Sequence, residues 1–178
     1  MWGWILAYVH AAQGAQAGLP GPGASLLTFA VIASGVLGCL LGGVMSDRIG
    51  RTATTALMMM ASGFCALAIG FVFDGPPWLF IAVAVVWGVT VIGDSAQFSA
   101  IVTEVTDSRF VGTALALQLG LGFALTVITV RLVPVVAAAL GSWQWAFLIL
   151  APGPIIGTIA ILILRRLPEA ARIAHGRR

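Results

Sequence analysis

The chain has 178 residues, of which 60% are hydrophobic and 8% are charged, and its mean hydropathy is +1.07. Soluble domains carry about 25% charged residues, so this composition excludes a soluble globular protein. The net charge of +3 is not the footprint of a nucleic-acid-binding protein, because all nine basic residues are arginines and five of them lie in the last fourteen residues.

The apolar segments recur at lengths that suit a bilayer, which needs about 20 residues for one helical span. The first segment is about half that long, and the uncharged residues that follow it, 13–25, are expected to form a loop outside the cytoplasm. We predict an all-α membrane protein of six spans with a truncated first helix. The spans are 1–12 (partial), 26–45, 53–73, 78–98, 111–130 and 143–164, and a basic tail follows at 165–178.

Small and helix-breaking residues mark two of these spans. Gly38 and Gly42 are four residues apart in the second span, and this spacing predicts a face on which another helix packs closely. In the sixth span, Pro152-Gly153-Pro154 removes two backbone donors, so a bend is expected there. Broken helices mark binding sites in some transporters, and a packing kink is the alternative.

Residues 43–52 form the densest cluster of charge before the tail and read Gly-Val-Met-Ser-Asp-Arg-Ile-Gly-Arg-Thr. This spacing resembles the signature of the major facilitator superfamily of transporters, Gly-x-x-x-Asp-Arg-x-Gly-Arg followed by a basic residue. The matching residues are Gly43, Asp47, Arg48, Gly50 and Arg51, and Thr52 stands where the second basic residue is usual. The resemblance implies a gate at the cytoplasmic mouth. The alternative role for the two arginines is a topological anchor.

The distribution of arginine predicts the orientation of the chain. If the loop 46–52 is inside, the inner segments 46–52, 99–110 and 165–178 contain two, one and five arginines. The outer loops 13–25, 74–77 and 131–142 then contain none, none and one. Positive residues collect on the cytoplasmic side of inner-membrane proteins. We therefore expect a multi-pass protein of the cell inner membrane with the motif loop and the tail in the cytoplasm.

The resemblance extends through 93–99, 104–114 and 143–147, which look like the tenth helix, the turn into the eleventh, and the twelfth helix of family members. It implies an MFS-like six-helix half bundle. The expected function is the C-terminal half of an ion-coupled secondary transporter of small solutes that works by alternating access. Its expected partners are the lipid bilayer, a small-molecule substrate, and a missing N-terminal half or a second chain. The alternative is a non-transporting scaffold or a relic half-protein.

Three polar residues inside the spans are candidates for coupling or substrate contact. The Asp94 carboxylate is costly inside a membrane unless it faces protein or water, so a coupling or substrate-contacting acid is one interpretation. The alternative is that it lies about 24 Å along its helix, near the cytoplasmic interface, hydrated or bonded to Ser95, Gln97 or an arginine. Gln118 would hydrogen-bond substrate or a neighbouring helix. Arg131 would line the outer part of a cavity or extend to the interface along its apolar stem.

Catalytic and metal-binding patterns are absent from the sequence. Ser34-Gly35 and His10 do not make the constellation of an intramembrane protease, and a lone histidine is too little for a metal site. We therefore expect no enzymatic activity, no cofactor and no metal. The two cysteines, Cys39 and Cys65, lie inside apolar segments and are expected to pack rather than to form a disulfide.

Overall fold

The computed structural model describes residues 1–16, 21–168, 170, 172 and 173, and within these residues it contains helices and no strand. Five helical segments are long and apolar enough to cross a membrane, and the shorter α1 precedes them. This confirms the all-α membrane architecture. The elements are α1 (Ile5–Gln16), α2 (Gly21–Ala33), α3 (Gly35–Ile49), α4 (Arg51–Phe71), α5 (Pro77–Val105), α6 (Val111–Leu140), the 3-10 helix η1 (Ala146–Leu150) and α7 (Pro152–Arg166).

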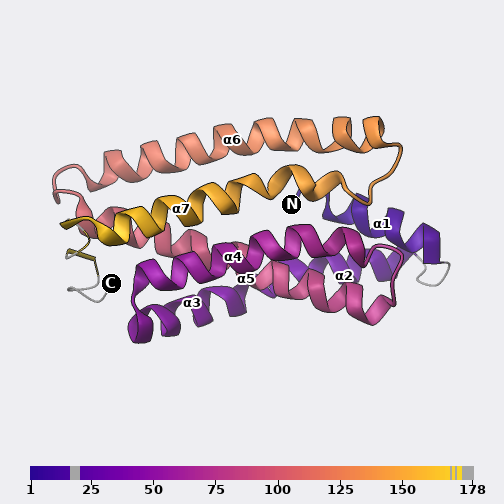
Figure 1. The fold of residues 1–178 in the computed structure, drawn as a ribbon, viewed down its shortest axis with the longest axis horizontal. Helices are drawn as coiled ribbons and strands as arrows, with labels where there is room; N and C mark the ends of the chain where they lie inside the picture. The colour runs from indigo at the N-terminus through magenta and orange to yellow at the C-terminus, as the bar shows by residue number, and fades with distance from the viewer. Residues whose placement is uncertain (17–20, 169, 171, 174–178) are drawn as a thin grey trace.

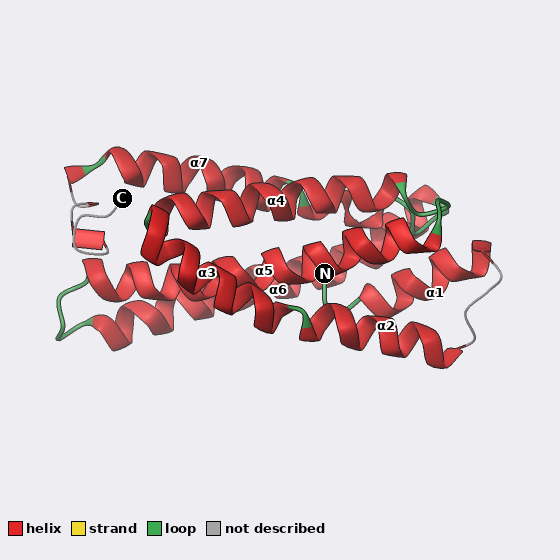
Figure 2. Ribbon diagram, turned by 90° about the horizontal axis from the view of Figure 1, so that it is seen from below, coloured by secondary structure: helices red, strands yellow, loops and turns green. Residues whose placement is uncertain are grey.

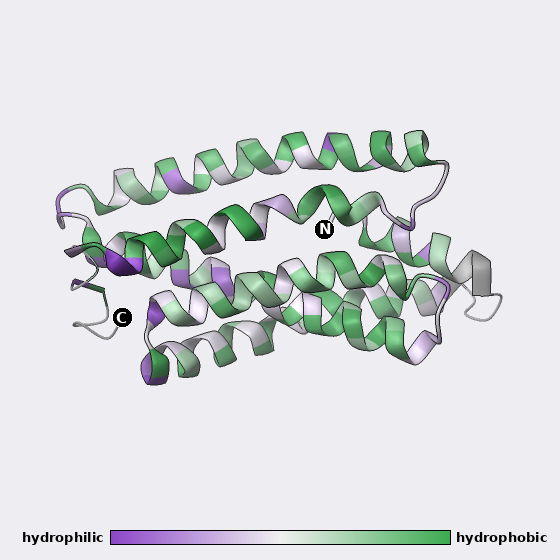
Figure 3. Cartoon of the chain, in the orientation of Figure 1, coloured by the Kyte–Doolittle hydropathy of each residue, from purple (hydrophilic) through white to green (hydrophobic). Residues whose placement is uncertain are grey.

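The helices run roughly side by side along one long axis (Figure 1). One end of the bundle holds the α3–α4 turn, the α5–α6 connection and the end of α7, and we call it the motif end (Figure 2). The helices are hydrophobic along most of their length, and hydrophilic residues collect at the motif end (Figure 3). This pattern is the one expected of helices that cross a bilayer.

The second predicted span is two helices, α2 and α3, joined at Ser34. The Ser34 Oγ hydroxyl donates to the carbonyl oxygen of Val31 at 2.7 Å and lies 3.2 Å from that of Val85 in α5. A hydroxyl bonded back to its own helix competes with the backbone ladder, which explains the break. Together the two helices form one apolar segment, Pro22–Ile49, which is longer than the predicted span 26–45.

The predicted glycine face of α3 is confirmed, and α5 is the helix that packs on it. Gly38 and Gly42 are both buried. A side chain at Gly42 would come within 3.0 Å of the Gly93 carbonyl oxygen, and one at Gly38 would collide with the backbone at Val89. The two backbones therefore approach at a distance that a residue larger than glycine would prevent.

The short helix α1 is anchored in the bundle by one fully buried face. Ile5, Tyr8 and Val9 are 0% exposed. The Tyr8 ring lies against those of Phe73 and Phe147, with centroids 5.1 and 4.6 Å away, and its hydroxyl donates to the Gln144 carbonyl oxygen at 2.9 Å. This aromatic cluster forms the core at the end of the bundle opposite the motif end.

Several helices extend past their predicted ends because polar residues do not interrupt them. Helix α5 continues to Val105 rather than 98, and α6 continues to Leu140 rather than 130. The predicted outer loop 131–142 is therefore mostly helix, and Gly141, with a φ of 65°, ends it in the left-handed conformation that glycine favours. Residues 13–16 and 21–25 of the predicted loop 13–25 are helical, and residues 17–20 lie outside the described part.

The bend predicted at 152–154 is a change of helix type. The 3-10 helix η1 ends at Leu150, and α7 begins at Pro152, where a proline costs no helical hydrogen bond. Helix α7 then packs along α4, and a side chain at Gly63 would come within 3.1 Å of the Pro154 ring. The break therefore starts a new α-helix rather than kinking a continuous one.

The predicted basic tail, 165–178, begins inside α7, which includes Arg165 and Arg166. Beyond it, Ala170 and Ile173 are 0% exposed and pack with Ala56, Ile101 and Ile161 at the motif end. Residues 169, 171 and 174–178 of the tail lie outside the described residues. The described part of the tail thus covers the motif-end surface of α4, α5 and α7.

Candidate functional site

The predicted seven-residue motif loop, 46–52, is wrong in extent: α3 continues to Ile49 and α4 begins at Arg51, which leaves Gly50 as a one-residue corner. Gly50 has φ 90° and ψ 154°, a region that is essentially restricted to glycine. Its N–H donates to the Ser46 carbonyl oxygen, and its own carbonyl oxygen accepts from the Thr54 N–H, both at 3.1 Å. The glycine thus lets two helices meet without a loop.

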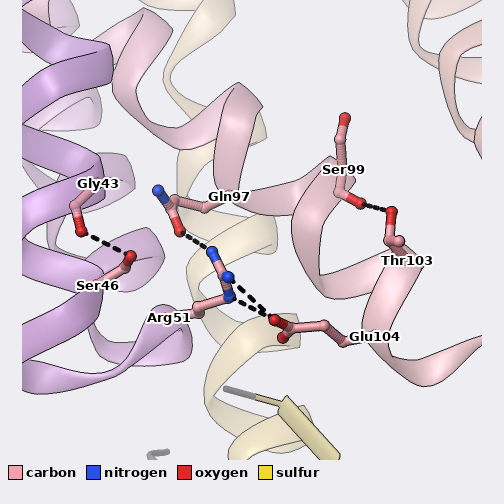
Figure 4. A network of polar contacts seen from close by, with 7 residues as sticks. All are labelled: Gly43, Ser46, Arg51, Gln97, Ser99, Thr103 and Glu104. Atoms are coloured by element: carbon pink, nitrogen blue, oxygen red, sulfur yellow. Dashed lines mark hydrogen bonds and ion pairs between the residues drawn. The ribbon is translucent and has the colours of Figure 1, made fainter. Parts of the chain in front are cut away.

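The corner directs the Arg51 side chain toward α5 (Figure 4). Arg51 Nε and Nη2 each lie 3.0 Å from Glu104 Oε1, and Nη1 donates to Gln97 Oε1 at 3.4 Å. The side chains of Arg51 and Glu104 are each 26% exposed. These three residues, which we call the Arg51 cluster, fasten the start of α4 to the last turns of α5.

The other motif residues lie in the last turns of α3 and at the corner. Asp47 and Arg48 are exposed near the end of α3. A side chain at Gly43 would meet nothing within 4 Å, and its carbonyl oxygen accepts from the Ser46 hydroxyl at 2.9 Å. Thr52 is 0% exposed, so the position where family members carry a second basic residue is enclosed in this chain.

A second polar region is a groove of about 240 Å³ between α5 and α6, which we call the α5–α6 groove. One of the three predicted candidates, Gln118, lines it, and a second, Asp94, is hydrogen-bonded to a lining residue. Gln118 lines the groove, and its Oε1 is buried without a hydrogen-bond partner among the described residues. Asp94 Oδ1 accepts from the hydroxyl of Ser95, another lining residue, at 3.2 Å. The lining residues are Ser95, Phe98, Ser99, Gln118, Leu119, Gly122, Phe123 and Thr126.

The third predicted candidate, Arg131, does not line this groove. Arg131 is exposed within α6, nine residues before its end at Leu140, and next to Val130, whose carbonyl oxygen accepts from Trp4 Nε1 at 2.8 Å. Because α6 continues to Leu140, Arg131 lies inside a helix rather than in the outer loop predicted at 131–142.

Sequence reasoning missed several residues of both sites. Gln97 and Glu104 in the Arg51 cluster lie 46 and 53 residues from Arg51, and no local pattern joins them. In the groove, Ser95 was expected only as a partner of Asp94, and Ser99 was missed. Ser99 lies four residues from Ser95 and so on the same face of a helix, and that spacing is the signal that could have found it.

A further ion pair lies in the connection between α5 and α6, outside the spans. Arg109 Nη2 lies 3.3 Å from Asp107 Oδ2, and the Arg109 backbone N–H donates to Asp107 Oδ1 at 3.0 Å. These hydrogen bonds favour the charged carboxylate and hold the pKa of Asp107 below its ordinary value. Both side chains are largely exposed, so the pair shapes the turn rather than a site.

The described residues contain no group of three or more histidine, cysteine, aspartate and glutamate side chains placed to hold a metal ion. The two candidate polar regions are the Arg51 cluster at the motif end and the α5–α6 groove within the spans.

The model of the Major Facilitator Superfamily matches the chain over residues 1–178. The chain belongs to this family, and it is a multi-pass membrane protein of the transporter type. Comparisons with curated proteins and with solved structures give no match.

Proposed function

We propose that the chain is the C-terminal half of an ion-coupled secondary transporter of small solutes, and that the α5–α6 groove is one wall of the solute path. The observation that supports this proposal is the groove itself, which is lined by Gln118, Ser95 and Ser99 of two apolar spans, with Asp94 hydrogen-bonded to Ser95 beside it. Intramembrane polar groups of this kind mark solute and ion pathways. The groove is open, so a second wall must enclose a solute there, from an N-terminal half or from a second chain.

The Arg51 cluster supports the gating part of the proposal. It joins α4 to α5 at the motif end, which we place at the cytoplasmic face because arginines collect there. Alternating access requires contacts at one mouth that hold in one state and release in the other. Arg51 and Glu104 are partly buried, so their pairing can resist opening without being permanent.

Water access to the groove separates a transporter from a scaffold. In a chain with Cys39→Ser and Cys65→Ser, single cysteines replace Ser99 and Thr126 in the groove, and Leu121 outside its lining serves as the control. We expect a membrane-impermeant maleimide to label both groove positions in cells and to leave Leu121→Cys unlabelled. If neither groove position is labelled more than Leu121→Cys, lipid fills the groove and the scaffold alternative is correct.

Transport is then measured in proteoliposomes that contain the chain alone or together with an N-terminal half from a family member. Uptake driven by a pH gradient is expected when the second wall is present. Asp94→Asn is expected to abolish its dependence on pH, and an unchanged pH profile in this variant would remove Asp94 from ion coupling. Uptake by the isolated monomer would show that no second wall is needed.

A further inference from the structure

The described part of the tail has a buried apolar side and an exposed basic side. Ala170 and Ile173 are 0% exposed, whereas Arg172 between them is exposed, as are Arg165 and Arg166 before them. Removing apolar side chains from water stabilises the arrangement that buries them. The tail is therefore held against the bundle by its apolar side, and its charges remain in solvent.

The chain turns across the motif end where α7 stops. Leu167 follows α7 with an extended backbone, φ −78° and ψ 151°, and Pro168 comes next. A residue before proline is biased away from the helical region, and proline cannot continue the ladder of hydrogen bonds. The Ala170 N–H then donates to the Leu167 carbonyl oxygen at 3.1 Å in a tight turn. This end to the helix lets the tail cross the motif end instead of projecting from it.

The docked tail joins three helices. Ala170 and Ile173 pack in one cluster, the motif-end cluster, with a buried residue from each helix. These residues are Ala56 of α4, Ile101 of α5 and Ile161 of α7. The motif-end cluster is separate from the main core, and the tail provides two of its five buried members among the described residues. The tail thus forms a strap across the ends of α4, α5 and α7.

Phe98 connects this strap to the α5–α6 groove. Its ring lines the groove and also packs against the motif-end cluster. Ile101, which packs with the strap, lies three residues after Phe98, and residues at this spacing are neighbours on the surface of a helix. Closely packed side chains transmit a displacement to their neighbours, so the position of the strap affects the wall of the groove.

We propose that the docked strap keeps the motif-end mouth of the α5–α6 groove closed, and that its release opens this mouth. While the strap is docked, Ala170 and Ile173 tie α5 to α4 and α7, and Phe98 stays in the groove wall. Once it is released, the motif end of α5 is free to move relative to α6. This proposal names the regulation of the groove and rests on the proposed function in treating the groove as a path that opens.

The test is the rate at which a water-soluble maleimide labels a Ser99→Cys reporter in the groove. The chain carries Cys39→Ser and Cys65→Ser and is held in phosphatidylcholine nanodiscs. Ile173→Asp should raise the rate about tenfold or more, because burial of an isoleucine shifts a docking equilibrium by about ten- to hundredfold. Ile173→Leu keeps an apolar side chain of the same volume and should retain the parental rate.

Two controls separate release of the strap from other effects. Arg172→Asp places the same acid at an exposed position of the tail and should leave the rate unchanged. Ile5→Ala and Ile173→Ala shorten the same side chain at two sites that are both 0% exposed, one at each end of the bundle. General loosening would speed labelling in both variants, whereas the strap predicts a faster rate in Ile173→Ala alone. Circular dichroism checks that each variant is folded.

Two outcomes overturn the strap: equal rates in Ile173→Asp and the parent, or a rate that rises as much in Ile5→Ala as in Ile173→Ala. Failure of the proposed function gives a different pattern. If the groove is not open to water, Ser99→Cys reacts no faster than Leu121→Cys even after Ile173→Asp. If the strap alone fails, Ser99→Cys reacts faster than Leu121→Cys in the parent, and Ile173→Asp does not change its rate.

Discussion

Replacing Arg51 and Glu104 by alanine, singly and together, tests whether the Arg51 cluster fastens α4 to α5. Both Arg51 Nε and Nη2 lie 3.0 Å from Glu104 Oε1, and each side chain is 26% exposed. Exposed ion pairs contribute about 0–1 kcal/mol, and hydrogen bonds to charged groups about 1.5–3 kcal/mol. For a pair that is three-quarters buried and joined by two donors, we expect a coupling energy of about 1–2 kcal/mol.

The assay is reversible unfolding of the protein in mixed micelles, followed by circular dichroism, with the coupling energy taken from the double-mutant cycle. The matched control is the cycle on Asp107 and Arg109, whose side chains are 51% and 78% exposed. Its coupling should be clearly smaller because water screens the pair. A coupling for Arg51 and Glu104 that is no larger than the control would show that the cluster does not hold the helices together.

Three further predictions concern the motif end. Gly50→Ala should destabilise the protein by about 1–3 kcal/mol because alanine is strained at φ 90°, ψ 154°, whereas Gly43→Ala, with nothing within 4 Å, should change it little; the same unfolding assay compares the two. Asp107→Asn should lower stability by a constant amount at neutral pH, and the difference from the parent should shrink as the pH falls below about 4. The sign follows because the folded-state pKa of Asp107 is depressed, so its stabilisation is complete above the unfolded pKa and is lost as the pH falls through the folded one; an unchanged difference at low pH would contradict this. Ile173→Asp should speed maleimide labelling of an Ile101→Cys reporter in a background without Cys39 and Cys65, because it detaches the tail from the motif end, whereas exposed Arg172→Asp should not; equal rates in both variants would show that the tail does not cover Ile101.

Much of the fold follows from hydropathy and glycine spacing. Each apolar segment of about 20 residues is helical, and the Gly38–Gly42 face packs where the spacing predicts. The ends of the helices are less predictable because a polar residue does not stop a helix. Glu104 and Arg131 both lie inside helices that the charge pattern would end earlier.

The candidate sites were predictable to the extent that their polar residues stand out in apolar spans. Asp94 and Gln118 are conspicuous for this reason. Gln118 lines the α5–α6 groove, and Asp94 accepts a hydrogen bond from Ser95, which also lines it. The contacts of Arg51 were not predictable, because they join residues that are far apart in the chain and depend on how α4 and α5 are rotated. Serine and threonine are common in transmembrane helices, so nothing in the sequence marked Ser99 and Thr126 as lining residues of the groove.

The rotation of α5 links the two sites. Gly93 and Gln97 lie on the face of α5 that meets α3 and Arg51, and Ser95 and Ser99 lie on another face, toward α6. Each residue advances about 100° around a helix, so fixing one face fixes the other. The close backbone contact at Gly93 and the hydrogen bond from Arg51 to Gln97 therefore set the direction in which the groove hydroxyls point. If the groove is the solute path proposed above, Arg51 would hold its wall in place without touching the solute.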